Sequence, residues 1–440
     1  MQVKINHSMS LFGTSGIRRL ADKGLVELAL KTGLAVGSIY DSVVVGRDTR
    51  TSGNALAHAF IAGTLAAGAE CCDTGILPTP TLALATRKFK AGAMVTASHN
   101  PPEYNGIKLL NPDGSAFDAG QREQIEQLIL TEATQAAPWD EIKSSRTYEG
   151  AIEEHIAHIT KYFPGERKVR VVLDCACGAG SVITPYLLRK LGAEVLALNC
   201  YPSGFFPHTI EPTEDNLSDL MRATREFGAD IGIAHDGDAD RMMAIDEQGR
   251  FIPGDKLLVI FARQAGAKGV VTTVDASMAI DETGFNVTRT KVGDIYVSEE
   301  LKNGGEFGGE PSGAWVFPHS SLCPDGIYAA AQIVAIASRQ KLSKLVNNIA
   351  DYPLLRGSVP SAGITLPNLV ERLQELNPLA VNNVDGIRLS FAEGWLLIRP
   401  SGTEPKIRVT AQARSETRAH QLYDDAMKVI KDSTKGGKRG

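Results

Sequence analysis

The chain has 440 residues, of which 43 % are hydrophobic and 22 % are charged. This is the balance of an ordinary globular protein, and the length leaves room for about three or four domains. The formal net charge of −5 argues against nucleic acid as a partner, because binding to a phosphate backbone usually needs a surplus of basic residues.

Signals for export or for a membrane are not visible either. Residues 1–13 lack the apolar core of a secretory signal, and the longest mostly apolar stretch, residues 55–69, is too short to span a bilayer. The six cysteines include no CxxC pair, which favours reduced thiols. We therefore expect a cytoplasmic protein without a membrane partner.

The predicted elements alternate between strands and helices over most of the chain. A buried strand at 42–46 is followed by a helix from 52 to about 68, and another strand lies at 91–96. The same order begins again with a strand at 168–173, and a third time with a strand at 269–274. Such alternation is typical of parallel or mixed sheets covered by helices.

The C-terminal part of the chain has a different pattern. Strand-like segments at 386–391, 395–400 and 406–413 precede an amphipathic helix at 415–431, which indicates an α+β module. We therefore predict an α/β protein with three similar α/β domains that contain mixed sheets, followed by a smaller C-terminal α+β domain. The predicted domains cover residues 1–150, 151–252, 253–355 and 356–440.

The acidic segment from His235 to Arg241 is the most informative part of the sequence. Its carboxylates, Asp236, Asp238 and Asp240, occupy alternate positions and share one side if the segment is extended. Like charges so close together repel unless a cation holds them, and oxygen ligands suit Mg²⁺ or Ca²⁺.

Two alternatives are open for this segment. One is a solvated acidic turn, and the other is an EF-hand loop in which Glu247 would be the last ligand. The EF-hand is disfavoured because Arg241 stands where that loop needs glycine, and because the flanking residues have strand patterns.

A second candidate site is the loop at 97–102, which follows a predicted strand and contains Ser98 beside His99. A serine nucleophile needs a base, or a metal that stabilises its oxygen. Adjacent side chains rarely point at each other, so this pair alone does not predict a catalytic dyad.

Two further loops carry groups that suit a phosphosugar. The segment 399–406 combines a fixed cation, two hydroxyls and a glycine, which would form a phosphate cradle, although a plain hairpin turn is an equal alternative. These residues are Arg399, Ser401, Gly402 and Thr403. The glycine-rich segment 304–313 offers Glu310 and Ser312 for sugar hydroxyls.

Two other patterns are not interpreted as sites. The segment 174–183 is similar to a dinucleotide-binding loop, but Ile183 replaces the third glycine of that loop. His155 and His158 have helical spacing without a third ligand nearby in the sequence, so we expect packed or surface histidines.

Taken in chain order, these segments resemble the motifs of the α-D-phosphohexomutase family across nearly the whole chain. The resemblance is carried by Phe12–Arg18, by Thr96–Pro101 with Tyr104–Lys108 after it, and by Asp236–Arg241, Gly309–Gly313 and Arg399–Pro405. These segments resemble, in the family's own order, its N-terminal motif and its phosphoserine, metal, sugar-recognition and phosphate loops.

The resemblance implies four domains around a central cleft, with one loop from each domain. It implies that Ser98 carries a phosphate and that one Mg²⁺ per chain is held by Ser98, Asp236, Asp238 and Asp240. The implied catalytic residues are Ser98, Arg18, Lys108 and His99. The implied substrate-binding residues are Arg241, Lys291, Asp294, Glu310, Ser312, Arg399, Ser401, Gly402 and Thr403.

The implied activity is that of a phosphohexomutase, an intramolecular phosphotransferase acting on a small phosphosugar. The sugar would receive the phosphoryl group of Ser98, turn end for end as a bisphosphate, and return its other phosphate. A hexose 1,6-bisphosphate is therefore a candidate activator. The sequence leaves the oligomeric state open.

The expected hexose depends on few residues. Lys291–Asp294 and Gly402 resemble the phosphoglucosamine mutase branch, so we expect interconversion of glucosamine 6-phosphate and glucosamine 1-phosphate. The alternatives are a phosphomannomutase/phosphoglucomutase and a catalytically silent phosphosugar-binding protein. Ala314 departs from the family, which usually has a histidine there, and His319 is a candidate replacement.

Overall fold

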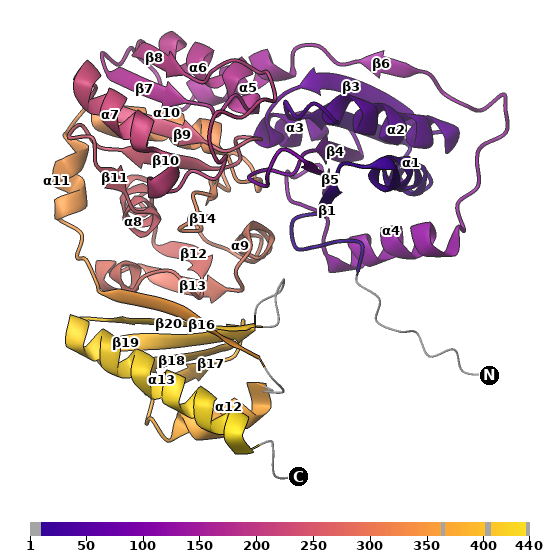
Figure 1. Ribbon diagram of the computed structural model, residues 1–440. Coiled ribbons are helices and arrows are strands. Elements are labelled where there is room, and N and C mark those ends of the chain that lie inside the picture. Colours follow the sequence, from indigo (N-terminus) through magenta and orange to yellow (C-terminus); the bar gives the residue numbers. More distant parts are fainter. Residues whose placement is uncertain (1–9, 362–365, 401–405, 437–440) are drawn as a thin grey trace. The chain divides into compact units, whose positions relative to one another are not determined.

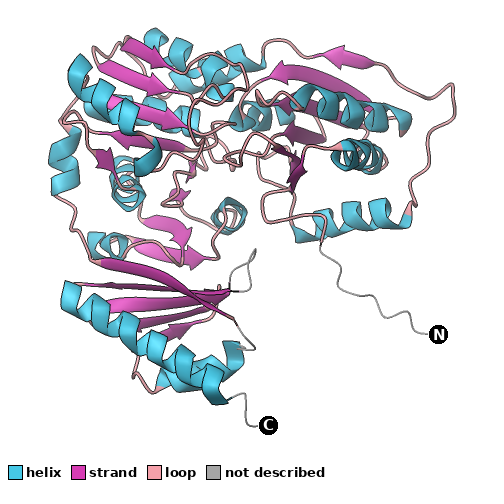
Figure 2. Cartoon of the chain, viewed as in Figure 1, coloured by secondary structure: helices cyan, strands magenta, loops and turns pink. Residues whose placement is uncertain are grey.

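The computed structural model describes residues 10–361, 366–400 and 406–436. Tertiary contacts divide the chain into two units, whose elements are shown in Figures 1 and 2. The first unit contains the residues up to 254 together with 312–346, and the second contains 255–311 together with the residues from 347 onward. Within the described residues, none of the helices has the length and apolar character needed to cross a membrane.

The first sheet of the first unit has the strand order β1-β5-β4-β2-β3-β6. Its elements are β1 (Ile17–Leu20), α1 (Lys23–Gly37), β2 (Ser42–Arg47), α2 (Gly53–Ala66), β3 (Glu70–Ile76), α3 (Thr79–Thr86), β4 (Ala91–Val95), β5 (Tyr104–Leu110), α4 (Ala119–Thr131) and β6 (Ser145–Thr147). β2 pairs in parallel with β3 and β4, while β5 is antiparallel to β1 and β4. The sheet is therefore mixed, as the sequence predicts.

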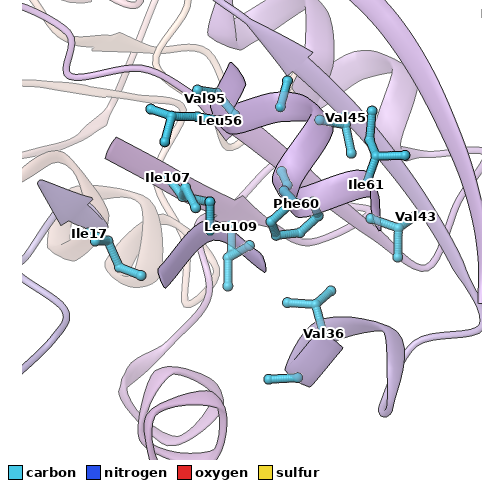
Figure 3. Packing of buried hydrophobic residues seen from close by; sticks show 14 of the residues in the cluster. Ile17, Val36, Val43, Val45, Leu56, Phe60, Ile61, Val95, Ile107 and Leu109 are labelled. Carbon is cyan, nitrogen blue, oxygen red and sulfur yellow. The ribbon is translucent and has the colours of Figure 1, made fainter. Parts of the chain in front are cut away.

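β2 is buried on both faces, which explains its uninterrupted run of valines. Val43 and Val45 belong to a core cluster with residues of α1 and α2, whereas Val44 belongs to a second cluster with residues of α3. Figure 3 shows the first cluster, in which Phe60 of α2 packs with Leu109 of β5. A strand covered on both sides is continuously apolar instead of alternating.

The second sheet of the first unit has the strand order β11-β10-β9-β7-β8. Its elements before residue 255 are α5 (Ala151–Thr160), β7 (Arg170–Asp174), the 3₁₀ helix η1 (Ala179–Val182), α6 (Thr184–Lys190), β8 (Glu194–Leu198), the 3₁₀ helix η2 (Glu214–Asn216), α7 (Ser218–Phe227), β9 (Ile231–His235), β10 (Met242–Ile245) and β11 (Phe251–Ile252). The later segment of this unit contains α10 (Gly326–Ala337) and α11 (Leu342–Asn347), and also β15 (Trp315–Val316), which is not a strand of this sheet. β7 is parallel to β8 and β9, and β10 is antiparallel to β9 and β11.

Residues 312–346 pack with the first unit, although the sequence predicts one continuous domain over 253–355. α10 is almost entirely apolar and contacts β9, β10 and α6. The indole N–H of Trp315 donates to the carbonyl oxygen of Met242 at 2.8 Å. The second sheet therefore uses this segment to complete its core.

The second unit contains an α/β part and an antiparallel part. In the α/β part, β12 (Gly269–Thr273) pairs in parallel with β13 (Asn286–Thr290) and β14 (Phe307–Gly309). This part also contains α8 (Gly254–Gln264), the 3₁₀ helix η3 (Met278–Thr283) and α9 (Asp294–Leu301). The antiparallel part has the strand order β16-β20-β19-β18-β17. Its elements are β16 (Leu354–Pro360), α12 (Leu366–Gln374), β17 (Ala380–Asn382), β18 (Ile387–Phe391), β19 (Gly394–Pro400), β20 (Lys406–Ala413) and α13 (Glu416–Gly436).

The antiparallel sheet has an apolar layer on each face. Leu373 of α12 and Leu422 of α13 belong to the same core cluster as Leu396 of β19, whereas Trp395 clusters with Val274 after β12. The sequence-predicted strands differ from β18, β19 and β20 by at most one residue. The expected boundary between 355 and 356 falls inside β16, because β16 pairs along β20. The predicted fold class, α/β with a C-terminal α+β part, is confirmed.

α1 and α2 approach closely through glycines, and this contact can be tested. A Cβ atom at Gly63 would lie 2.1 Å from the carbonyl oxygen of Leu30, so Gly63→Ala must move backbone. We expect it to lower the free energy of unfolding by about 1–3 kcal/mol, measured by urea denaturation. Gly120→Ala, in the first turn of α4, is the control: a Cβ atom there would lie in ordinary contact, 3.4 Å from Asp118 Oδ1, so the variant should change stability by less than about 1 kcal/mol. Equal effects would contradict the close packing.

Candidate active site

The two sheets of the first unit place polar loops at equivalent points. In the first sheet, β2 lies between two parallel neighbours, and Ser98 follows β4. In the second sheet, β7 lies between two parallel neighbours, and Asp236 follows β9. Open α/β sheets bind ligands at such points, where strand order reverses and the carboxyl ends of neighbouring strands separate.

Ser98 and Asp236 are brought together although they lie far apart in the sequence. The Ser98 hydroxyl is 2 % exposed and donates to Asp236 Oδ2 at 2.6 Å. The Ser98 backbone has a φ of 51°, in the left-handed region. His99 Nδ1 lies 3.3 Å from Ser98 Oγ, so this neighbour also contacts the hydroxyl.

The three aspartates form a buried carboxylate cluster. One oxygen from each of Asp236, Asp238 and Asp240 lies within 4.8 Å of the others. The segment links the antiparallel strands β9 and β10, and all three residues are buried. The alternatives of a solvated acidic turn and of a helix-flanked EF-hand are therefore wrong.

Lys108 provides positive charge inside the cluster. Its Nζ lies 2.7 Å from Asp238 Oδ2 and 2.5 Å from Asp240 Oδ2. Burial alone would raise the pKa of Asp238, but the Lys108 ammonium overrides it and the pKa is lowered. At Asp236, burial together with the charges of Asp240 and Asp238 outweighs the opposing charge of Arg241, and its pKa is raised well above the ordinary value.

The cluster has the donor set of a hard divalent cation. Its ligands are carboxylate oxygens, which Mg²⁺ and Ca²⁺ prefer. The Oδ1 atom of Asp238 is buried and, among the described residues, has no hydrogen-bond partner. A cation would lower the raised pKa of Asp236 and would give the unpaired oxygen of Asp238 a partner. The residues therefore fit a metal held by the three aspartates beside Ser98.

Arg18 is another cation beside the Ser98 loop. Its Nη1 donates to the side-chain oxygen of Asn100 at 3.0 Å, while its Nε is buried without a hydrogen-bond partner in the described part of the chain. Three residues that the sequence predicts therefore lie around the Ser98 loop and the carboxylate cluster: Arg18, Ser98 and Lys108. An unpaired guanidinium donor there suits an anion such as phosphate.

His99 and Arg241 also lie near this region. Burial, together with the charges of Arg241, Arg18 and Lys108, lowers the pKa of His99 to about 2. His99 is therefore a neutral imidazole at ordinary pH. Arg241 pairs with Glu211 at 3.3 Å, and its backbone N–H donates to Asp236 Oδ1 at 3.2 Å.

Four sequence-predicted substrate-binding residues lie in the second unit. Glu310 Oε1 accepts the backbone N–H of Gly293 at 2.8 Å, which ties it to the segment that holds Lys291 and Asp294. Arg399 Nη2 lies 2.8 Å from Asp385 Oδ2, and that oxygen also accepts the N–H of the neighbouring Val292 at 3.0 Å. The structure therefore links the segment of Lys291 and Asp294 to both Glu310 and Arg399. The buried Nε of Arg399, like that of Arg18, is without a hydrogen-bond partner among the described residues.

The remaining predicted residues have different outcomes. Ser312 is exposed and belongs to the first unit. Ser401, Gly402 and Thr403 lie outside the described residues. Ala314 is buried in a bridge with Arg241. His319, the candidate replacement, instead packs in an aromatic cluster and lies 2.9 Å from the Tyr328 hydroxyl.

The histidines at helical spacing are packed, as the sequence predicts. His155 Nδ1 lies 2.9 Å from the Thr81 hydroxyl and its Nε2 lies 3.1 Å from Asp325. His158 contacts Ser320 at 2.9 Å. Neither belongs to a cluster of three metal-ligating side chains in the described residues.

Sequence reasoning missed residues that support the site without carrying its chemistry. Thr79, the first residue of α3, donates its hydroxyl to Asp238 Oδ2 at 2.5 Å and its backbone N–H to the Asp238 carbonyl at 3.0 Å. A Cβ atom at Gly178 would lie 2.6 Å from the Gly237 carbonyl oxygen, so Gly178, rejected as part of a dinucleotide loop, allows close backbone contact. Arg50 was also missed, and a charged run directly after the buried strand β2 was the available signal.

The comparisons with known proteins agree over most of the chain. Profiles of the phosphoglucomutase/phosphomannomutase family match domain I at residues 9–136, domain II at 153–249, domain III at 253–352 and the C-terminal domain at 364–429. A "probable phosphoglucosamine mutase" from Methanosarcina barkeri is 48 % identical over 437 residues, which cover 97 % of this chain and 100 % of that protein.

Solved structures are similar as well. A phosphoglucomutase/phosphomannomutase family protein from Burkholderia thailandensis has a TM-score of 0.86 and 28 % identity, over 97 % of this chain and 98 % of the other. An N-acetylphosphoglucosamine mutase from Aspergillus fumigatus, solved with GlcNAc-6P and magnesium, shares the fold with a TM-score of 0.62 at 18 % identity, over 96 % of both chains.

The carboxylate cluster makes a prediction about metal binding. We expect Mg²⁺ to bind the protein and raise its melting temperature, because the cation balances the repulsion between the aspartates. Asp240→Asn should weaken the affinity by about tenfold or more, since it removes a charged ligand, as measured by isothermal titration calorimetry. Asp219→Asn, at an exposed carboxylate of α7, is the control. An unchanged affinity in Asp240→Asn would place the metal elsewhere.

Proposed function

This chain belongs to the phosphoglucomutase/phosphomannomutase family of intramolecular phosphotransferases, and we propose that it interconverts glucosamine 6-phosphate and glucosamine 1-phosphate through a phosphorylated Ser98. In this proposal one Mg²⁺ is held by Ser98, Asp236, Asp238 and Asp240, and the intermediate is a bisphosphorylated sugar.

One observation carries the proposal: a buried serine hydroxyl lies 2.6 Å from an oxygen of the carboxylate cluster. A phosphoryl group on Ser98 Oγ would lie beside the metal ligands. A divalent cation at that place would supply electrostatic stabilisation of the transferring phosphoryl group. Burial of Ser98 supports the same conclusion, because a phosphoserine shielded from water is protected from hydrolysis.

The chain's own groups would supply the remaining stabilisation. The unpaired Nε of Arg18 is available to the phosphoryl oxygens, and Lys108 adds a second positive charge. Catalysis of phosphoryl transfer depends mainly on such positioning and charge. The neutral His99 would contact Ser98 Oγ without adding charge.

The transfer can be written as two balanced steps. The free hydroxyl oxygen of the sugar forms a bond to the phosphorus, the bond from phosphorus to Ser98 Oγ breaks, and the hydroxyl proton is transferred to Ser98 Oγ. The bisphosphate turns end for end. Ser98 Oγ then attacks the other phosphate, the bond from that phosphorus to the sugar oxygen breaks, and the serine proton is transferred to the released sugar oxygen. The enzyme is phosphorylated again, and phosphate has moved between C6 and C1.

The preference for glucosamine phosphate rests on the second unit. Asp294 stands where the phosphomannomutase/phosphoglucomutase branch typically has a histidine, and Glu310 is tied to the same segment through Gly293. Carboxylates there favour a sugar that carries an ammonium group. The name of the Methanosarcina barkeri relative, a probable phosphoglucosamine mutase, supports the same substrate. A hexose 1,6-bisphosphate is the activator we expect.

Substrate choice is decided by a coupled assay with glucosamine, mannose and glucose 6-phosphates. Glucosamine 6-phosphate should give the highest kcat/KM. A higher value with mannose 6-phosphate or glucose 6-phosphate would favour a phosphomannomutase/phosphoglucomutase instead. Binding without turnover of any of the three would favour a silent phosphosugar-binding protein.

Ser98→Ala tests the phosphoserine. It removes the oxygen that carries the phosphate, so turnover should fall by several orders of magnitude while the fold is retained. Intact mass spectrometry should find one phosphoryl group on the wild-type protein and none on the variant. Ser38→Ala, at an exposed hydroxyl after α1, should keep both the phosphate and the activity. Near-normal turnover in Ser98→Ala would refute the assignment.

Arg399→Ala tests the proposed clamp for the phosphate that the sugar already carries. Losing a charge-assisted hydrogen bond should raise KM by about 10–100-fold, with a smaller effect on kcat, in the same coupled assay. Arg372→Ala, at an exposed arginine of α12, serves as the matched control. If KM is unchanged in Arg399→Ala, another group binds this phosphate.

A further inference from the structure

We propose that Arg50 is a positioning residue that holds the Ser98 loop in its reactive conformation, with Asp48 and Thr96 as its partners. The proposal deepens the proposed function, because it rests on Ser98 being the residue that exchanges phosphate. Arg50 itself would contact neither the substrate nor the phosphoryl group.

The conformation of Ser98 needs an explanation from its surroundings. Its φ of 51° lies in a region that residues with side chains rarely adopt. Such a conformation persists where contacts around it impose it. The side chain gains one strong contact, to Asp236, so the remaining restraint must come from the backbone.

Arg50 uses its full hydrogen-bonding capacity on this loop. An arginine has five N–H donors, and all five have partners here. Nη2 donates to the carbonyl oxygens of Ser98 at 2.8 Å and Asn100 at 2.6 Å. Nη1 donates to those of Pro101 at 2.6 Å and Tyr104 at 2.9 Å. Nε donates to Asp48 Oδ2 at 3.1 Å. The guanidinium plane therefore fixes four carbonyl groups of one loop at once.

The N–H group of Ser98 is connected to the same arginine by another route. It donates to Thr96 Oγ1 at 2.8 Å, and the Thr96 hydroxyl donates to Asp48 Oδ2 at 2.6 Å. That oxygen is the one that accepts from Arg50 Nε. The N–H and the C=O of Ser98 are thus held from both sides by one closed ring of hydrogen bonds.

The ring is shielded from water. Arg50 is 2 % exposed, Asp48 and Thr96 are fully buried, and the Phe206 ring lies 5.3 Å from the guanidinium carbon. Burial raises the pKa of Asp48 to about 6, against the opposing effect of Arg50 and Thr96. Hydrogen bonds among buried charged groups are strong and specific in geometry, which suits a rigid support.

Arg18 contacts the same loop as Arg50 but has a donor available for a ligand. Its Nε is buried without a hydrogen-bond partner among the described residues, so it can donate to an anion. Arg50 has no donor left for a ligand. Two arginines therefore contact the same loop with different roles, one available to phosphate and the other committed to the backbone.

Thr96→Val and Thr96→Ser form a matched pair that tests the ring. Valine keeps the shape of threonine but loses the hydroxyl, whereas serine keeps the hydroxyl. Misplacement of Ser98 Oγ should lower kcat in Thr96→Val by roughly 10–100-fold while KM changes by less than about twofold. Thr96→Ser should stay within about threefold of the wild-type kcat.

A second measurement, the lifetime of the phosphoserine in water, distinguishes a role of the ring in positioning Ser98 from a role in the stability of the fold. Phospho-enzyme prepared from each variant, incubated without sugar, should lose its phosphate to water faster in Thr96→Val than in Thr96→Ser, as followed by intact mass. Thermal unfolding of both variants shows whether they are folded. If Thr96→Val keeps the wild-type kcat and phosphate lifetime, the proposal is overturned. Equal losses in the two variants would also overturn it, because they would show that any change at position 96 lowers the activity, whether or not the hydroxyl is kept.

Arg50→Lys tests the arginine directly. The variant keeps the charge, but an ammonium has three donors on one atom and cannot replace the planar fork across four carbonyl groups. We expect kcat to fall further than in Thr96→Val, with KM again nearly unchanged. A wild-type kcat in a folded Arg50→Lys would overturn the proposal.

These outcomes are distinguishable from a failure of the proposed function. If wild-type protein carries no phosphate on Ser98, and Ser98→Ala is active, the proposed function itself is wrong and the role of Arg50 falls with it. If wild-type protein is phosphorylated and only the Thr96 and Arg50 variants behave like wild type, the mutase assignment stands and the positioning role alone is rejected.

Discussion

Repulsion among three buried carboxylates is the constraint on which the site depends. Asp236, Asp238 and Asp240 are held within 4.8 Å of one another, and buried charges are tolerated only when they are compensated. Lys108 compensates two of them, and the unpaired oxygen of Asp238 leaves a place for a cation. Two neighbouring residues hold the acidic loop in place against this repulsion: Thr79 on α3 and Gly178 after β7.

The same arrangement of strands occurs in three sheets of the chain. β2, β7 and β12 each lie between two parallel neighbours. In each case a strand beside the central one ends in a loop with a polar group: Ser98 after β4, Asp236 after β9 and Glu310 after β14. A shared architecture can therefore present three different polar groups, because the strand ends are fixed while the loops are free to vary.

The sequence predicted the fold class and the carboxylate row of the candidate site, because both leave local signals. Buried strands are apolar runs, and a row such as Asp236, Asp238 and Asp240 is visible without a structure. It missed Arg50 and Thr79, whose partners are mainly backbone carbonyl groups and a carboxylate of another segment. Backbone groups are the same for every residue, so the charged run after β2 indicates that Arg50 lies at the end of a buried strand but not which groups it binds.

The return of residues 312–346 to the first unit affects how the protein is made. During synthesis the ribosome releases β9 and β10 well before α10, the helix that covers them. The apolar face of the second sheet that α10 covers therefore stays exposed while the intervening residues, which belong to the other unit, are translated. Exposed surface of this kind promotes aggregation, so a nascent chain halted before α10 should be a strong client for chaperones.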